Sequence, residues 1–171
     1  MTMHADERDR LAALIAVQEG RSPVPLLDRA AIDMLFAQRP RIALVGASDK
    51  PGRPAHDTMA ALLRLGVDVV PVNPALTEVL GRACYPTVVA AVAATGPVDI
   101  VDVFRRPEFC ADHARDAVAA GATCLWLQLG IADEEAGRIA HAAGLGVVMD
   151  RCTLIELHRL VTAVRRQEAQ S

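Results

Sequence analysis

Apolar residues in the middle of the chain fall into five short, nearly continuous runs separated by longer amphipathic stretches. The runs are rich in β-branched residues and span Ile42 to Val45, Val67 to Val72, Val98 to Phe104, Cys124 to Leu129 and Val147 to Met149. Strands that are covered on both faces have this pattern, because neither face needs polar side chains. The sequence therefore predicts a sheet of about five buried strands.

The amphipathic stretches between these runs begin and end with residues that are typical of helix termini. Pro54 opens one stretch and Gly66 closes it, while Asp133 with two following glutamates opens another that ends at Gly144. Regular alternation of strand and helix predicts an α/β fold in which an open, doubly wound parallel sheet has helices on both faces. A barrel of eight such units needs about 250 residues, and this chain has 171.

The chain before Arg41 has helical rather than strand periodicity. Residues 7–19 and 26–38 carry apolar positions at helical spacing, and the breaker Ser22-Pro-Val-Pro25 separates them. We expect residues 1–40 to form a helical N-terminal arm that packs on a single α/β domain over residues 41–171.

Composition excludes several classes of partner. A net charge of −3 without long charged runs, together with 3% aromatic residues, speaks against nucleic-acid binding. No apolar stretch reaches the roughly 20 residues of a membrane span, and the N-terminus is charged rather than signal-like, so we expect a cytoplasmic protein without a membrane partner. The four cysteines and five histidines lack paired spacing, which predicts reduced thiols and no metal site.

The turn after the first strand is the strongest candidate for a ligand site, because open α/β sheets bind ligands beyond the carboxyl ends of their strands. Gly46 begins this turn, leaves the backbone accessible, and is followed by the possible donors Ser48, Lys50 and Arg53 ahead of a helix start. Free amides at a helix start favour negative charge, so the turn is typical of a phosphate site. A glycine- and proline-rich connection that binds no ligand would have a similar sequence. The turn matches neither the P-loop motif G-x-x-x-x-G-K-[ST] nor the dinucleotide-binding motif G-x-G-x-x-G.

The second strand ends in Asn73 and Pro74, where NAD-binding domains usually place an acidic residue that holds the ribose. The missing carboxylate speaks against NAD. NADP remains an alternative, because Arg53 or Arg105 could take its 2′-phosphate. Asn73 and Pro74 would suit an adenosine moiety, or they form a plain turn.

The remaining strand ends add further candidates. A helix start at Pro107 is preceded by Phe104, Arg105 and Arg106. The two arginines either bind a second phosphate or lie at the surface in contact with solvent. Gln128 interrupts an apolar run, where its amide needs a partner from the protein or from a ligand. Cys152 follows the fifth strand near a helix start, which favours the thiolate.

The motifs at these strand ends together resemble the stand-alone CoA-binding family, small relatives of the N-terminal domain of the succinyl-CoA synthetase alpha subunit. They are Val45-Gly-Ala-Ser-Asp-Lys-Pro-Gly-Arg-Pro54, Val72-Asn-Pro74, Val101-Asp-Val-Phe-Arg-Arg-Pro107, Leu125-Trp-Leu-Gln-Leu-Gly130 and Val148-Met-Asp-Arg-Cys152. The likeness spans about residues 41 to 160. It implies a Rossmann-like domain with coenzyme A or an acyl-CoA as its small-molecule ligand.

The resemblance also implies a role for each candidate. The turn cradles the coenzyme's phosphates with Gly46, Ala47, Ser48, Lys50 and Arg53, while Asn73 and Pro74 flank the nucleotide. Phe104, Arg105, Gln128 and Gly130 line the groove for the pantetheine arm, and Cys152 lies toward the later strands.

The resemblance favours a CoA-binding module that acts as a carrier, sensor or regulator without catalysis of its own. Ligase activity is not expected, because the synthetase relies on a further domain that bears a phosphorylated histidine. Two alternatives stay open: an NAD(P)-responsive regulatory domain, and a thiol-redox enzyme in which Cys152 exchanges with the coenzyme's thiol but lacks an evident base. A homodimer or a protein partner also stays open.

Overall fold

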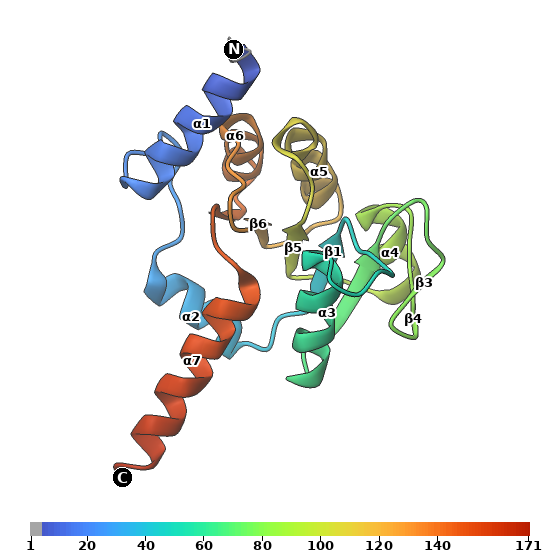
Figure 1. Cartoon of the computed structure of the whole chain (residues 1–171), viewed down its shortest axis with the longest axis vertical. Helices are drawn as coiled ribbons and strands as arrows, with labels where there is room; N and C mark the ends of the chain where they lie inside the picture. Colours follow the sequence, from blue (N-terminus) through green and yellow to red (C-terminus); the bar gives the residue numbers. More distant parts are fainter. Residues whose placement is uncertain (1–4) are drawn as a thin grey trace.

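The computed structural model describes residues 5–171 and is built around one parallel sheet (Figure 1). The strands lie in the order β2-β1-β5-β6-β7. Their bounds are β1 Ile42–Val45, β2 Val69–Val72, β5 Ile100–Val103, β6 Cys124–Leu127 and β7 Gly146–Val148. The five predicted strands and the doubly wound fold are confirmed, and several runs extend past the hydrogen-bonded strand by one to two residues.

The strand order places the ligand edge between β1 and β5. The chain moves from β1 to β2 on one side and then returns to β5 on the other side of β1. Leu44, in the middle of β1, pairs with Pro71 of β2 and with Asp102 of β5. Helices that follow these strands leave in opposite directions at this point, which opens a crevice beyond the carboxyl ends of the strands.

Helices cover both faces of the sheet. One face packs against α4 (Val88–Thr95), α5 (Pro107–Ala119) and α6 (Glu134–Ala142), and the other packs against α2 (Arg29–Ala37), α3 (Pro54–Arg64) and α7 (Thr153–Glu168). Successive strand residues point to opposite faces. Val45 accordingly belongs to the first core and Leu44 to the second.

The helix signals predicted from the sequence are present. Proline occupies the start of both α3 and α5, where its missing N–H costs no hydrogen bond. The Asp133 side chain accepts a hydrogen bond from the backbone N–H of Ala136 and so caps α6. No helix within residues 5–171 has the length and apolar character to cross a membrane.

The N-terminal arm consists of α1 (Ala5–Gln18), a connecting segment and α2; its first four residues lie outside the described residues. α2 begins at Arg29, later than the predicted residue 26, because the Asp28 carboxylate caps it by accepting from the Ala31 N–H at 2.8 Å. The segment before it lies along the edge strand: Leu27 N donates to Val147 O at 2.9 Å, and Val24 is buried. The arm therefore covers the β7 edge of the sheet.

A short hairpin and α4 follow β2 in a part of the chain where the sequence analysis located no element. β3 (Glu78–Val79) and β4 (Arg82–Ala83) pair antiparallel around Leu80 and Gly81, which both have positive φ. Two-residue strands are too short to show alternation, and α4 is too uniformly apolar to show a polar face. Tyr85 returns from the hairpin to the sheet, where its carbonyl accepts from Asn73 N at 2.9 Å.

Candidate functional site

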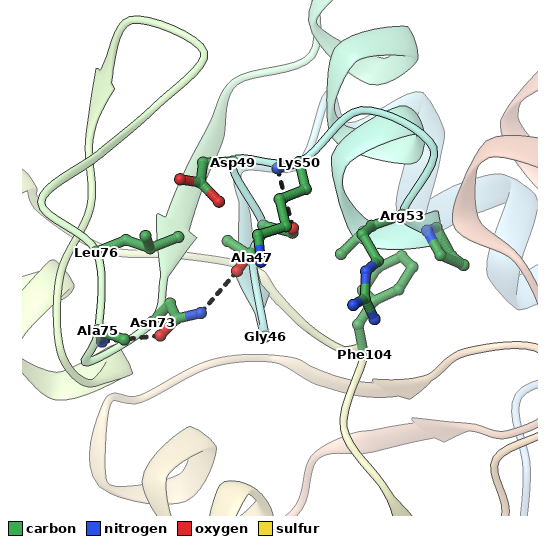
Figure 2. A pocket seen from close by; sticks show the side chains of 12 residues that line it. Gly46, Ala47, Asp49, Lys50, Arg53, Asn73, Ala75, Leu76 and Phe104 are labelled. Carbon is green, nitrogen blue, oxygen red and sulfur yellow. Dashed lines mark hydrogen bonds between the residues drawn. The ribbon is translucent and has the colours of Figure 1, made fainter.

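A cleft of about 490 Å³ opens at the carboxyl ends of β1 and β2 (Figure 2). Its lining consists of Gly46, Ala47, Ser48, Asp49, Lys50, Arg53, Pro54, Ala55, Asn73, Ala75, Leu76 and Phe104. The turn residues named from the sequence, with Asn73 and Phe104, therefore meet in one cavity.

Gly46 is required by the close approach of β1 to the end of β5. Its φ is +82°, and a Cβ there would lie 2.8 Å from the carbonyl oxygen of Phe104 and 3.1 Å from Cδ of Arg105. An L side chain would be strained by the backbone angle and would also meet a carbonyl that cannot move freely. The glycine thus allows the β1 turn to lie against the strand that carries Phe104 and Arg105.

Hydrogen bonds from backbone N–H groups to side-chain oxygens hold the turn from Ser48 to Arg53 in place. Ser48 Oγ accepts from Lys50 N at 3.1 Å, and the carboxylate of Asp57 on α3 accepts from Gly52 N at 3.0 Å. The Gly52 hydrogen bond is the largest cause that lowers the pKa of Asp57. The first turn of α3 therefore fixes the loop that precedes it.

Two unpaired cations border the cleft. The side chains of Lys50 and Arg53 are exposed and form no ion pair or hydrogen bond with any residue of 5–171. Asp49 adds one negative charge at the rim, so these three side chains together carry a charge of about +1. The start of α3 also lacks a side-chain cap at Arg53. Cations beside an open helix start favour an anionic group such as a phosphate.

Asn73 joins the two loops that form the cleft. Its Nδ2 donates to the Ala47 carbonyl at 2.8 Å, and its Oδ1 accepts from Ala75 N at 2.9 Å, as Figure 2 shows. An aspartate could make only the second of these contacts as an acceptor. Asparagine at the end of β2 therefore positions the cleft wall.

A second, smaller cleft of about 170 Å³ adjoins the first and shares Gly46 and Asn73 with it. Pro74 and Arg105, two further candidates from the sequence, line this second cleft. The guanidinium carbon of Arg105 lies 4.6 Å from the centre of the Phe109 ring, which holds the arginine by a cation–π contact.

Gln128 lies in neither cleft, because its partners are inside the protein. Its Nε2 donates to Asp102 Oδ1 at 2.7 Å and to Thr153 Oγ at 2.8 Å, and the Thr153 hydroxyl donates to Asp102 Oδ2 at 2.9 Å. All three side chains are buried. Burial, the largest cause, raises the pKa of Asp102 to about 7 against these hydrogen bonds, which lower it.

Asp102 was not among the candidate site residues predicted from the sequence. The signal was present in the motif around it, since a lone carboxylate between Val101 and Val103 must be buried in a strand that is covered on both faces. A buried acid beside a buried amide suggests that the two side chains are partners. This network links β5, the end of β6 and the start of α7 behind the ligand edge.

Gly130 and Cys152 also lie outside the two clefts. Gly130 N donates to the Asp150 carboxylate at 2.7 Å, and Asp150, with φ of 55°, also accepts from Gln18 of the arm. Cys152 precedes α7 without a capping hydrogen bond and is half-buried, whereas the other three cysteines are buried. Among the four thiols, Cys152 is the most accessible to solvent.

The sequence matches the family described as the CoA binding domain over residues 40–158, which include every element of the cleft. The chain belongs to this CoA-binding-domain family. It is 36% identical over 124 residues to the uncharacterized protein YneT of Bacillus subtilis, a match that covers 72% of this chain and 90% of that protein.

Solved structures similar to this chain include a protein of similar size and one part of a larger enzyme. A hypothetical protein from Pyrococcus horikoshii OT3 superposes with a TM-score of 0.74 at 38% identity and covers 79% of this chain and 93% of its own. A dinucleotide-forming acetyl-coenzyme A synthetase of Ca. Korarchaeum cryptofilum, solved with phosphate and ADP, has a TM-score of 0.55 at 26% identity. That match covers 64% of this chain but only 25% of the synthetase. The family resemblance inferred from the strand ends is confirmed.

Proposed function

We propose that this protein binds coenzyme A, or an acyl-CoA, at the cleft beyond β1 and β2 and acts as a carrier, sensor or regulator of the cofactor without catalysis of its own. The observation that carries the proposal is the pair of cations beside the Gly46 turn, Lys50 and Arg53, which form no ion pair with any residue of 5–171. Coenzyme A presents phosphates to such a site, and the charge-assisted hydrogen bonds that result are stronger than neutral ones.

The proposed pose follows from the shape of the site. The phosphates lie at the turn from Gly46 to Arg53, and Asn73 and Pro74 flank the nucleotide. The pantetheine arm leaves past Phe104 and Arg105 toward Gly130. Gln128 supports this edge through Asp102 and Thr153 instead of contacting the arm.

A thermal-shift panel of CoA, acetyl-CoA, NAD and NADP tests the proposal. At 100 times its dissociation constant, CoA adds about 2.7 kcal/mol to the free energy of unfolding. For a domain of this size that gain raises Tm by roughly 5 to 10 °C. The expected result is a shift with CoA or acetyl-CoA that exceeds the shift with either dinucleotide. A response to NADP or NAD without a response to CoA would overturn the proposal in favour of an NAD(P)-responsive domain.

A further inference from the structure

A closed triangle of hydrogen bonds lies buried behind the ligand edge. Its corners are Asp102 in β5, Gln128 directly after β6 and Thr153 at the start of α7. One contact joins each pair of corners, at 2.7, 2.8 and 2.9 Å. The three residues are at most 4% exposed, so solvent does not readily replace a contact that is lost.

The number of hydrogen atoms in the triangle depends on the protonation state of Asp102. When the carboxylate is ionised, the Gln128 amide supplies two hydrogens and the Thr153 hydroxyl supplies one, so each of the three contacts receives one hydrogen. A protonated Asp102 brings a fourth hydrogen to the same three contacts. Either one hydroxyl hydrogen must then turn to an acceptor outside the triangle, or the amide must rotate and leave two oxygens facing each other. Only the ionised form closes the triangle.

Two opposing effects act on the proton of Asp102. Burial favours the protonated acid, and no ion pair within residues 5–171 includes this carboxylate. The hydrogen bonds from Gln128 and Thr153 favour the ionised form. Burial is the larger effect and places the pKa of Asp102 at about 7, so both forms are populated near neutral pH.

The groups that surround Asp102 do not titrate in its place. On the neighbouring strands, Leu44 and Trp126 lie opposite it. Burial raises the pKa of the Cys124 thiol on β6 to about 12, so this thiol stays uncharged near neutral pH. Glu156 on α7 already forms ion pairs with two arginines. The buried residues of α2 and α3 carry no charge.

Each corner of the triangle adjoins the ligand edge. Asp102 and Gln128 lie two residues before Phe104 and Gly130, and Cys152 directly precedes the third corner. A displacement in the triangle therefore reaches this part of the edge through the backbone. The phosphate turn after β1 contributes no corner and is not displaced in this way.

We propose that the triangle is a pH-sensitive switch: it is closed while Asp102 is ionised and opens when Asp102 takes up a proton, which loosens the start of α7 and the adjoining edge. The inference rests on the proposed function in one respect, namely that the pantetheine arm runs along this part of the edge. It adds a regulation to that function, because the arm is held more firmly above neutral pH than below it.

Trp126 reports the state of the triangle without any ligand. It is the only tryptophan of the chain, lies opposite Asp102 in the sheet, and donates from Nε1 to the Arg151 carbonyl, just before α7, at 2.6 Å. Its fluorescence is expected to titrate with a midpoint at about pH 7 in the wild type and to lose this titration in Asp102→Asn. Asp112→Asn, at an exposed carboxylate on α5, is the control and is expected to retain it.

A pair of substitutions at Thr153 tests the switch while Asp102 is kept. Thr153→Val removes the hydroxyl with little change of shape, and Thr153→Ser retains it. Because the Thr153 hydrogen bond lowers the pKa of Asp102, the valine variant is expected to move the Trp126 midpoint to higher pH, and the serine variant to leave it near that of the wild type. A purely structural role of the hydroxyl would lower stability without moving the midpoint.

Titration calorimetry at about pH 6 and about pH 8 measures the effect on the ligand. CoA is compared with ADP, which carries a diphosphate but no pantetheine arm. In the wild type we expect the affinity for CoA relative to ADP to rise about three- to tenfold from the lower to the higher pH, the equivalent of about one hydrogen bond. Asp102→Asn is expected to lose this rise, and protonation of the ligands themselves cancels in the comparison of the two proteins.

The outcomes separate this inference from the proposed function. If CoA binds, but the Trp126 signal has the same pH dependence in the wild type and in Asp102→Asn, the switch is wrong while the proposed function stands. The regulation is also overturned if the rise in relative CoA affinity is the same in both proteins. If CoA binds at neither pH, the proposed function is overturned, and the Trp126 titration alone decides whether the triangle opens.

Discussion

Gly46 is the residue on which the geometry of the ligand edge depends most directly. Gly46 and Gly52 both have positive φ, at +82° and +85°, and both lie in the same turn. They differ in surroundings: an added Cβ at Gly46 meets the Phe104 carbonyl at 2.8 Å, whereas at Gly52 it meets nothing within 4 Å. Comparison of the two positions therefore separates backbone strain from steric collision.

Gly52→Ala is expected to lower the free energy of unfolding by about 1 kcal/mol through backbone strain alone. Gly46→Ala is expected to cost at least about 1 to 2 kcal/mol more, because β1 and β5 must move apart. Urea denaturation measures both values. Equal costs at the two positions would show that the close approach at Gly46 is not tightly packed.

Asp102 predicts a pH dependence of stability that can be isolated. Its pKa in the folded state is about 7, above the value of about 3.9 in an unfolded chain. Between these pH values the folded state holds a proton that the unfolded state has lost, so this group lowers the free energy of unfolding as pH rises from about 4 to about 7. Above about pH 7 the free energy of unfolding no longer falls through this group, because Asp102 is then ionised in both states.

Asp102→Asn removes this titration. The slope of the free energy of unfolding against pH, measured by urea denaturation between pH 4 and pH 7, is expected to become more positive than in the wild type. Asp112→Asn, which changes an exposed carboxylate, serves as the control and leaves the slope close to that of the wild type. Identical slopes for wild type and Asp102→Asn would contradict the raised pKa.

Cys152 predicts selectivity among the four thiols. Burial raises the pKa of Cys110 and of Cys124 to about 12 and also raises that of Cys84, whereas Cys152 is half-buried at the start of α7. With CoA disulfide, the Cys152 thiolate would attack one sulfur, form a mixed disulfide and release one CoA thiolate. Peptide mass spectrometry is expected to find CoA mainly on Cys152 and to lose that adduct in Cys152→Ser. Labelling mainly at Cys84, or nowhere while CoA binds, would remove the thiol-redox alternative.

At the scale of elements, the sequence predicted what depends on local pattern and missed what depends on tertiary contacts. Five strands were recognisable because burial on both faces makes each an apolar run, and α3 and α6 because proline and an acidic cap mark their starts. The β3-β4 hairpin was missed because its two-residue strands carry no periodicity.

The candidate site divides in the same way. Residues of one continuous turn, Gly46 to Arg53, could be predicted together because the chain itself connects them. Gln128 could not be placed from the sequence, since its partners Asp102 and Thr153 are 26 and 25 residues away. Likewise His113 and Asp116 lie within α5, away from any strand end, and only the packing of α5 against β5 and α4 brings them to the second cleft.

The N-terminal arm is expected to contribute to the stability of the domain that it covers. Val24 is buried with 2% of its surface exposed and lies against Gly137 of α6, where an added Cβ would approach it to 3.1 Å. Val24→Ala is expected to lower the free energy of unfolding by about 1 to 2 kcal/mol through lost burial and the resulting cavity. Met34→Ala, at an α2 residue that is 65% exposed, is the control and changes it by less than about 0.5 kcal/mol. Equal effects in urea denaturation would mean that the arm is only loosely attached.

For the whole molecule, the strand order sets where a ligand can lie. The clefts on the two faces of the sheet meet at Gly46 and Asn73, close to the point where the strand order reverses. The cations Lys50 and Arg53 lie on one side, and the mixed polar group of Arg105, His113 and Asp116 lies on the other. The two clefts therefore differ in charge: the cations give the first cleft a positive charge, whereas the charges of Arg105 and Asp116 offset one another in the second.

The central claim is that coenzyme A binds at this edge through its phosphates, and titration calorimetry of CoA tests it most directly. We expect wild-type protein to bind with a dissociation constant of roughly micromolar magnitude. Arg53→Ala, at the phosphate turn, and Arg105→Ala, beside the path of the pantetheine arm, are each expected to weaken binding by about 1 to 3 kcal/mol. Arg64→Ala is the matched control, because Arg64 is an exposed arginine at the other end of α3 that lines neither cleft. The account predicts that this control retains the wild-type affinity. CoA affinity that is unchanged in both Arg53→Ala and Arg105→Ala would contradict it.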